Sequence, residues 1–203
     1  MEYILVFFLS YLFGSIPFGL ILTKLFNKKD LRKIGSGNIG ATNVLRTGNK
    51  MLAVSTLILD VLKGYLPVLI TQRYYIELTY LSSLIVFLAH IFPVWLNFKG
   101  GKGVATYLGI LFALSLSLSI LFIFTWIIVT QIFKYASVSS IFSSFTVLTV
   151  TVLRENVVNA ITQINNNESG LKLILFIFFI LIIFTHRENI SNLKNKKENK
   201  IKI

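Results

Sequence analysis

Long apolar stretches, separated by short polar connections, constrain what this chain can fold into more than any other feature of its sequence. A membrane-spanning helix needs about 20 mainly apolar residues, with about 17 as the lower limit. With 55% hydrophobic and 14% charged residues, the 203-residue chain carries more apolar surface than a soluble domain of its size can bury. The sequence therefore predicts an all-α integral membrane protein. The stretches run roughly over Tyr3–Leu25, 51–71, 80–97, 104–133, 137–153 and 171–185.

The first stretch is expected to remain as a transmembrane helix and not to be removed as a signal peptide. It has no basic region before its apolar run, and its cations follow the run instead. This order of charge favours an N-terminus outside the membrane. Gly14, Pro17 and Gly19 interrupt the stretch, which membrane helices tolerate where neighbouring helices pack closely.

The distribution of Lys and Arg, which collect on the cytoplasmic side, sets the number of crossings. If the basic segment Lys24–Lys50 is cytoplasmic, Lys99 and Lys102 return to the cytoplasm two crossings later. Residues 104–133 must then hold two helices, because one helix would leave Lys134 and the basic tail outside. We therefore expect about seven transmembrane helices, with the N-terminus outside and the C-terminus cytoplasmic. Residues 1–190 are expected to form a single polytopic domain, 191–203 a solvated basic cytoplasmic tail, and Asn156–Gly170, with Asn165–Asn167, the outer connection.

Residues that carry metal or redox chemistry are scarce. The absence of cysteine excludes disulfides, thiol catalysis and thiolate metal sites, and two histidines are too few for a His-rich metal site. No cofactor and no metal are expected. The net charge of +12 is assigned to membrane topology and not to nucleic-acid binding.

Two glycine-rich, basic segments, Gly35–Arg46 and Lys99–Thr106, connect the apolar stretches. Glycine lets backbone N–H groups approach an anion closely, and Lys or Arg supplies the charge. Both segments therefore predict phosphate binding, with close helix packing as the alternative role of the glycines. The second segment has Gly103 where a nucleotide-binding P-loop has a hydroxyl residue, which argues against nucleotide binding. Together with Lys134–Ser140 and His186–Asn189, these segments are expected to fall on the cytoplasmic face, where the four could form one site.

These segments also carry a family resemblance. The chain resembles the bacterial acyl-phosphate:glycerol-3-phosphate acyltransferases, the PlsY-type membrane enzymes. The resemblance implies a seven-helix fold in the bacterial inner membrane and transfer of a fatty acyl group from acyl-phosphate to glycerol 3-phosphate. The products would be 1-acyl-glycerol 3-phosphate (lysophosphatidic acid) and phosphate, in phospholipid biosynthesis. The matching pieces are Ser15–Pro17, Gly35–Thr47, Leu59–Gly64, His90–Pro93, Phe98–Thr106, Tyr135–Ser140 and His186–Ile190.

The resemblance also implies partners and site residues. The partners are glycerol 3-phosphate, fatty acyl-phosphate and membrane lipid, with the enzyme that produces the acyl-phosphate as a further candidate. The catalytic set is His186, Asn189 and Lys102, and the substrate- and phosphate-binding set is Ser36, Asn38, Asn43, Arg46, Gly101, Lys102 and Ser140. Near the C-terminus the chain departs from the family, with Asn192 and Lys196 in place of Arg and Gly, although Glu198 falls where the family has an acidic residue.

The chemistry of the transfer leaves the role of His186 open. Acyl transfer to an alcohol needs a held phosphate, a polarised carbonyl and a proton acceptor. His186 could take the hydroxyl proton, or it could orient the site while the substrate phosphate takes the proton. No GxSxG motif occurs, and no Asp follows either histidine at the fifth position as in soluble-type glycerolipid acyltransferases. Ser140 could bind phosphate or back-bond within a membrane helix.

Three further charged or polar residues lie within apolar stretches. Asp60 and Lys63, three apart on a helix, are interpreted as a structural ion pair, with a proton or ion path as the alternative. His90 is interpreted as a packed, hydrogen-bonded residue.

Two other functional classes, a carrier and a scaffold, fit the sequence less well than the enzyme. A carrier for organic phosphates would use the same loops but favours internal repeats and a mid-membrane site, and neither loop is repeated. A membrane scaffold would not need so many polar groups in short connections.

Overall fold

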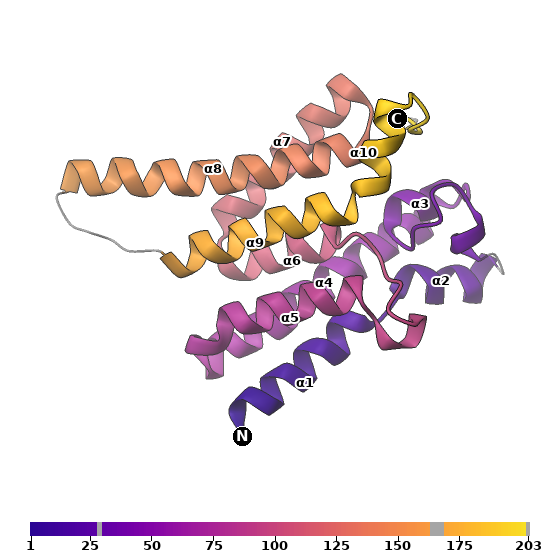
Figure 1. Cartoon of the computed structure of the whole chain (residues 1–203). Helices are drawn as coiled ribbons and strands as arrows, with labels where there is room; N and C mark the ends of the chain where they lie inside the picture. The colour runs from indigo at the N-terminus through magenta and orange to yellow at the C-terminus, as the bar shows by residue number, and fades with distance from the viewer. Residues whose placement is uncertain (28–29, 163–168, 202–203) are drawn as a thin grey trace. The chain divides into compact units, whose positions relative to one another are not determined.

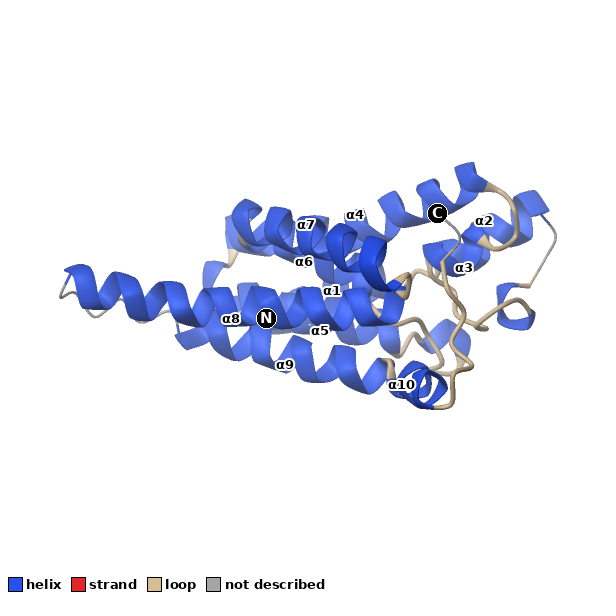
Figure 2. Ribbon diagram, turned by 90° about the horizontal axis from the view of Figure 1, so that it is seen from above, coloured by secondary structure: helices blue, strands red, loops and turns tan. Residues whose placement is uncertain are grey.

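The computed structural model describes residues 1–27, 30–162 and 169–201, and these residues form helices and loops with no strand among them (Figures 1 and 2). The expected all-α membrane fold is confirmed. The α-helices are α1 (Glu2–Ser15), α2 (Phe18–Asn27), α3 (Ala41–Leu45), α4 (Lys50–Tyr74), α5 (Thr79–Ile91), α6 (Val104–Leu114), α7 (Leu116–Phe133), α8 (Ala136–Thr162), α9 (Ser169–Thr185) and α10 (Arg187–Lys194). Three short 3₁₀ helices are η1 (Leu31–Lys33), η2 (Ile76–Leu78) and η3 (Val94–Leu96).

The helices contact one another in two compact units, Met1–Leu116 and Ser117–Ile203. In the first unit α4 lies at the centre and packs against α1, α2, α3, α5 and α6. Glycines explain the close approach of α4 and α6. A Cβ atom on Gly64 would overlap the carbonyl oxygen of Thr106, and one on Gly109 would overlap that of Val61. Small residues at a helix crossing let two backbones come into contact in this way.

The break between α1 and α2 is stabilised by the predicted ion pair. Pro17 has no backbone N–H, so carbonyl groups at the end of α1 lose their helical partner. The ammonium group of Lys63, on α4, donates to the carbonyl oxygen of Ile16 at 2.7 Å and lies 2.7 Å from the Asp60 carboxylate. Both charged side chains are buried. The structural ion pair expected from their spacing is confirmed, and it satisfies the backbone at the break.

The second unit is built around α8, which packs against α9. The Lys172 ammonium group on α9 lies 2.7 Å from the Glu155 carboxylate on α8. At the other end of α8, the hydroxyl group of Thr130 on α7 donates to Ser139 at 2.7 Å. Helix α8 continues to Thr162, so the expected outer connection begins later than residue 156, and Asn165–Asn167 lie outside the described residues.

The apolar stretch 104–133 divides into α6 and α7 at Ser115, as the charge distribution predicts. In the described ranges, five helical segments are long and apolar enough to cross a membrane, and a sixth is possible if α9 and α10, bent by 54°, form one span. The expected first span, Tyr3–Leu25, corresponds to α1 and α2 together. Helix α6 is apolar but shorter than these segments. The chain is therefore a multi-pass membrane protein.

Candidate active site

The first glycine-rich loop is organised by the side-chain amide of Asn43. Its nitrogen lies 3.0 Å from the carbonyl oxygen of Leu31, 3.0 Å from that of Ile34 and 2.7 Å from that of Asn38. Its oxygen accepts from the backbone N–H of Ser36 at 3.2 Å. The side chain is buried in the loop, with 1% of the residue exposed. Asn43, expected as a phosphate ligand, therefore has its polar atoms engaged with the loop backbone.

Ser36 and Arg46 occupy the surface of the same loop, and both are exposed. Gly35 lies between them and Asn43 with a φ angle of +55°, in the left-handed region. A Cβ atom there would lie 2.5 Å from Oδ1 of Asn43 and 2.8 Å from Cδ of Arg46, so the glycine leaves room for both side chains. Asn38 accepts from the backbone N–H of Gly40 at 3.0 Å, which closes the turn before α3.

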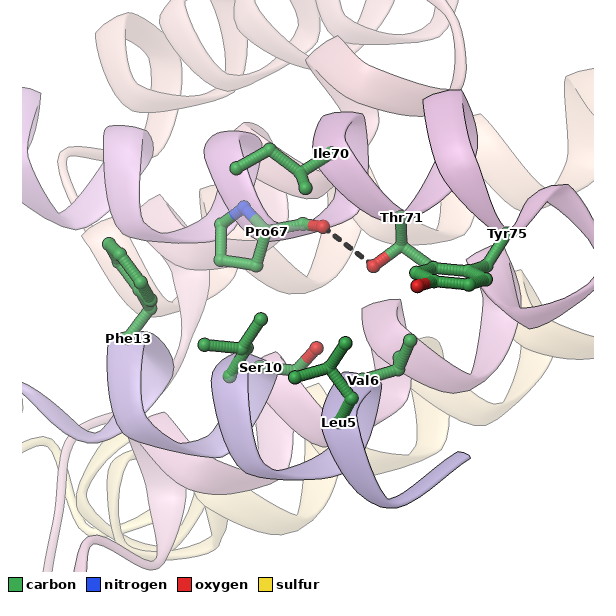
Figure 3. A pocket seen from close by; sticks show the side chains of 9 residues that line it. Leu5, Val6, Ser10, Phe13, Pro67, Ile70, Thr71 and Tyr75 are labelled. Carbon is green, nitrogen blue, oxygen red and sulfur yellow. Dashed lines mark hydrogen bonds between the residues drawn. The ribbon is translucent and has the colours of Figure 1, made fainter. Parts of the chain in front are cut away.

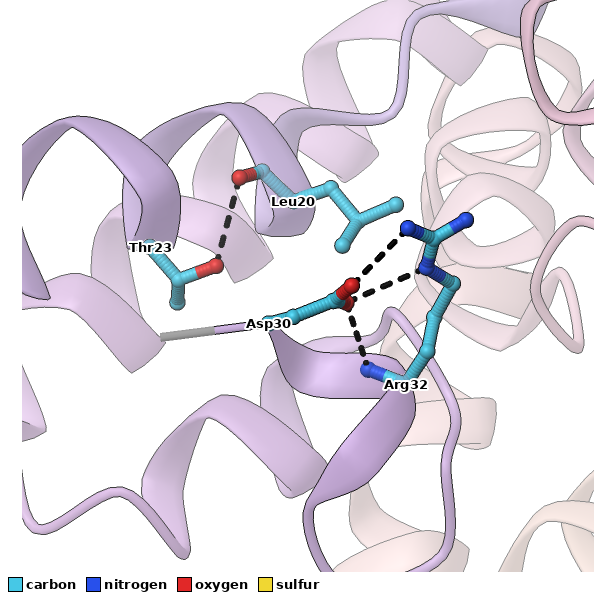
Figure 4. A network of polar contacts seen from close by, with 4 residues as sticks. All are labelled: Leu20, Thr23, Asp30 and Arg32. Carbon is cyan, nitrogen blue, oxygen red and sulfur yellow. Dashed lines mark hydrogen bonds and ion pairs between the residues drawn. The ribbon is translucent and has the colours of Figure 1, made fainter. Parts of the chain in front are cut away.

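A second arginine in this region is neutralised locally (Figure 4). The Asp30 carboxylate accepts from the backbone N–H of Arg32 at 3.0 Å and from its guanidinium group at 2.8 and 3.1 Å. These hydrogen bonds to Arg32 lower the pKa of Asp30 to about 2. Arg32 is thus held by its own loop.

The second glycine-rich loop folds back onto the end of α5. The backbone N–H groups of Gly100 and Gly101 donate to the carbonyl oxygens of Ile91 and His90 at 2.9 and 3.1 Å. A Cβ atom on Gly101 would overlap the His90 imidazole ring. The packing role proposed as the alternative for these glycines is therefore real. This packing fixes the backbone of Gly100 and Gly101, which directly precedes Lys102. Lys102 is half-buried.

The same loop ends at the N-terminus of α6. Gly103 is the N-cap residue with a φ angle of +80°. The first N–H groups of a helix lack intrahelical partners and carry partial positive charge, which favours an anion beside Lys102. His90 is buried, and its Nδ1 forms a 3.0 Å hydrogen bond with the hydroxyl group of Thr106. His90 is therefore a packed, hydrogen-bonded residue, as expected.

Both loops border one hydrophobic cluster of the first unit. Leu96, three residues before Lys99, packs against this cluster, and Ile39 and Val44 of the first loop belong to it. Figure 1 shows α3 and the loop between α5 and α6 at the same end of the unit. Two segments about 60 residues apart in sequence are thus brought to one region. The members of the cluster are Leu20, Leu31, Ile39, Val44, Leu52 and Ala53.

In the second unit, His186 lies at the bend between α9 and α10. Its Nδ1 is 2.8 Å from the carbonyl oxygen of Ile182. A carbonyl oxygen only accepts, so Nδ1 carries the proton in the neutral ring and Nε2 carries the lone pair. The residue is 2% exposed.

The predicted tail returns to this bend. The Asn189 amide donates to the Glu198 carboxylate at 2.6 Å, and the Ser137 hydroxyl group donates to the same oxygen at 3.2 Å. The backbone N–H of Ile201 also donates to the carbonyl oxygen of Lys134 at 2.8 Å. Glu198 and Ile201 are thus hydrogen-bonded to Ser137, Asn189 and Lys134, while most residues after 190 are exposed, and the solvated cytoplasmic tail stays a prediction. A boundary at residue 190 stays a prediction.

Ser140, on α8, forms hydrogen bonds within its own unit. Its hydroxyl group donates to the carbonyl oxygen of Ala136 at 2.8 Å and accepts from Trp126 at 3.2 Å. The donor is thus used in back-bonding, the alternative considered from sequence. Sequence reasoning identified Glu198 only as a positional match and did not predict its bonds to Asn189 and Ser137.

The described ranges offer no group of three or more His, Asp or Glu side chains that could hold a metal ion. A groove of about 370 Å³, counting space open to the outside, lies between α1 and α4 (Figure 3). Its lining, which includes Leu5, Phe13 and Tyr75, contains no charged side chain. It is therefore unsuited to a phosphate.

A multi-pass helical membrane protein whose first unit gathers two basic, glycine-rich loops belongs to the class of membrane proteins that can bind a phosphorylated substrate. Comparison with known proteins makes this specific. A model of the glycerol-3-phosphate acyltransferase family matches residues 4–196, and the chain belongs to this family. It is a glycerol-3-phosphate acyltransferase and an integral membrane protein.

Relatives cover essentially the whole chain. The glycerol-3-phosphate acyltransferase of Pelagibacter ubique is 52% identical over 203 residues, covering 100% of both chains. That of Brucella anthropi is 44% identical over 192 residues, covering 95% of this chain and 90% of its own. The crystal structure of PlsY, an integral membrane glycerol 3-phosphate acyltransferase in its glycerol 3-phosphate form, is 33% identical with a TM-score of 0.89, covering 100% of this chain and 96% of that one. Its lysophosphatidic acid form gives a TM-score of 0.86 at 32% identity, covering 98% and 95%.

Proposed function

We propose that this acyltransferase takes its acyl group from acyl-phosphate. The products are 1-acyl-glycerol 3-phosphate and phosphate. This transfer is the first step of phospholipid synthesis from glycerol 3-phosphate. The observation that carries the proposal is the pair of basic glycine-rich loops combined with the absence of GxSxG and HxxxxD motifs. An acyl-phosphate is already activated, so the enzyme needs phosphate-binding groups more than a nucleophile. The PlsY structure with lysophosphatidic acid supports the product.

The first unit binds phosphate in this proposal. Arg46 can form two parallel charge-assisted hydrogen bonds to a phosphate, and exposed Ser36 can add a third. Lys102 supplies a point charge beside the N-terminus of α6, with the backbone of Gly101 next to it. Asn38 and Asn43 contribute by shaping the first loop.

The second unit handles the proton. The glycerol 3-phosphate hydroxyl oxygen attacks the acyl carbonyl carbon, the bond from that carbon to the phosphate oxygen breaks, and phosphate leaves. Nε2 of His186 accepts the hydroxyl proton, which the leaving phosphate then takes up. The hydrogen bond from Nδ1 to Ile182 supports this role because it places the lone pair on Nε2. Asn189 is held by Glu198 to orient the substrate. Ser140 serves as a phosphate ligand once its hydroxyl group exchanges its bond to the Ala136 carbonyl oxygen for one to the phosphate.

The protein crosses the inner membrane seven times, with the N-terminus outside and the C-terminus and active site cytoplasmic. The spans are α1 with α2, and α4, α5, α6, α7, α8 and α9. Helix α6 has 11 residues and is therefore about 16 Å long, against about 30 Å of hydrocarbon. The polar loop before α6 must then lie partly at membrane depth, which is tolerated where protein covers it. A recessed loop suits a donor that arrives from the lipid. The enzyme that produces acyl-phosphate remains a candidate partner.

The test uses purified protein in detergent. Phosphate release from palmitoyl-phosphate should depend on glycerol 3-phosphate and match the amount of lysophosphatidic acid formed. Neither acyl-CoA nor acyl carrier protein loaded with a fatty acyl group should give product as the donor. Comparable turnover with acyl-CoA under the same conditions would show that the donor has been assigned wrongly.

A further inference from the structure

The loop between α5 and α6 contains two consecutive residues in an unusual conformation. Asn97 and Phe98 have φ angles of +50° and +61°. The left-handed region is uncommon for residues other than glycine and is strained for a bulky residue such as Phe98. Such a turn persists only where its surroundings hold it. It lies directly before Lys99, Gly100 and Gly101, so whatever holds the turn also sets the start of the second glycine-rich loop.

Two side chains of α1 hold the front of this turn. The hydroxyl group of Tyr11 donates to the carbonyl oxygen of Phe92 at 2.8 Å and accepts from the backbone N–H of Val94 at 3.1 Å. The hydroxyl group of Ser15 accepts from the indole N–H of Trp95 at 2.9 Å. Three hydrogen bonds from one helix thus fix the backbone on both sides of the proline at position 93 and the indole that follows.

The back of the turn is fastened to its front by the main chain. The N–H of Phe98 donates to the carbonyl oxygen of Pro93 at 3.0 Å, and that of Lys99 donates to Leu96 at 3.0 Å. The N–H of Gly100 then donates to Ile91 at 2.9 Å. The turn is therefore a closed unit, and movement of its front against α1 displaces the backbone that leads to Lys102.

We propose that Tyr11 and Ser15 are positioning residues for the second glycine-rich loop, and so for glycerol 3-phosphate binding. Neither acts on the substrate directly. They hold a strained turn against α1, and the turn places Lys102 and the N-terminus of α6. This inference rests on the proposed function in which that loop binds phosphate.

The decisive variant is Tyr11→Phe, which removes two hydrogen bonds and keeps the aromatic ring that stacks on Phe7. The KM for glycerol 3-phosphate should rise about 10-fold, with kcat changed less than about 2-fold, because neutral hydrogen bonds are lost while the reacting groups remain. Ser15→Ala should raise the same KM by about 3- to 5-fold. Ser15→Thr keeps the hydroxyl acceptor for the Trp95 indole and should therefore retain the normal KM.

Ser10→Ala is the matched control. Ser10 also lies on α1, and its hydroxyl group forms a buried 2.8 Å hydrogen bond with that of Ser82 on α5, away from the turn. This variant should lower the Tm and leave the KM unchanged, which separates positioning from general loss of helix packing.

The outcomes distinguish the positioning role of Tyr11 and Ser15 from the phosphate-binding role of the loop. If Lys102→Ala impairs the enzyme while Tyr11→Phe and Ser15→Ala keep the normal KM, the positioning role is refuted and the phosphate-binding role stands. If Lys102→Ala itself has no effect, the proposed function of the loop has failed. If Tyr11→Phe does not insert into the membrane, Trp95→Phe removes the bond to Ser15 at a 60% exposed residue and is judged by the same KM criterion.

Discussion

Replacing Asn43 by aspartate tests whether this residue builds the first glycine-rich loop or binds phosphate itself. The substitution conserves shape and replaces the amide NH₂ group by a carboxylate oxygen. The three carbonyl oxygens that lie 2.7 to 3.0 Å from the amide nitrogen would then face an acceptor instead of a donor. The bond from the Ser36 N–H to the other oxygen could survive.

The expected cost follows from the two donor hydrogens that are lost. The Leu31 and Ile34 carbonyl oxygens keep the backbone N–H donors of Ile34 and Gly37, so the Asn38 carbonyl oxygen is the acceptor that loses its donor. A buried acceptor without a donor costs about 1–3 kcal/mol, and Asn43→Asp should destabilise the loop by at least this amount. The site is 1% exposed, so water has little access to replace the missing donors. The loop should therefore open locally, while the membrane helices remain folded.

Limited trypsin digestion of the substrate-free protein measures this opening. Segment Asp30–Lys50 contains Arg32, Lys33 and Arg46 as cleavage sites, and their cleavage should accelerate by more than about 10-fold in the variant, in line with the opening free energy. Asn38→Asp serves as control because the Asn38 side-chain oxygen accepts from Gly40, a bond that a carboxylate keeps. Unchanged cleavage of Asn43→Asp, together with a raised KM for glycerol 3-phosphate, would refute the structural role and indicate direct phosphate binding.

Five further substitutions test the site and the membrane arrangement. Arg46→Lys keeps the charge but loses the fork, so kcat/KM should fall by roughly 10- to 150-fold, as steady-state kinetics would show. His186→Ala should abolish most turnover with a near-normal KM if Nε2 is the base, whereas moderate changes in both constants would assign it an orienting role. Asp60→Asn leaves a buried lysine without its ion partner and should destabilise the protein by about 3–5 kcal/mol, measured by Tm in detergent. Cysteine at Glu77 should react with an impermeant reagent in intact cells and cysteine at Asn195 should not; the reverse pattern would exclude the seven-span topology.

The division of residues 104–133 into two helices shows what the pattern of charged residues can predict. The need to return Lys134 to the side of Lys102 predicted two helices, and α6 and α7 separate at Ser115. The i, i+3 spacing likewise predicted the Asp60 and Lys63 pair. Both predictions succeeded because they depend on local spacing and on the cost of charge in hydrocarbon, which are properties of the chain itself.

Roles that depend on hydrogen-bond partners were harder to predict from the sequence. Asn43 looked like a phosphate ligand because an amide in a glycine-rich loop suits that role, yet its partners are main-chain carbonyl oxygens of the same loop. The contact between Glu198 and Asn189 and the clamp formed by Tyr11 and Ser15 belong to the same category. A main-chain partner leaves no mark in the sequence because every residue offers a backbone carbonyl, and the side-chain partners of Asn189 and Ser15 are set by tertiary packing.

The amino-acid sequence by itself determined that the chain is a helical membrane protein and which connecting segments are basic and glycine-rich, because hydrophobic length, charge and glycine content are additive along the chain. Only the tertiary structure decided which polar groups of those segments are engaged internally. Lys63 is directed to the carbonyl oxygen of Ile16, 47 positions away, because α4 crosses the break after α1. Such pairings follow from helix packing, where glycines such as Gly64 and Gly109 set how closely two backbones approach.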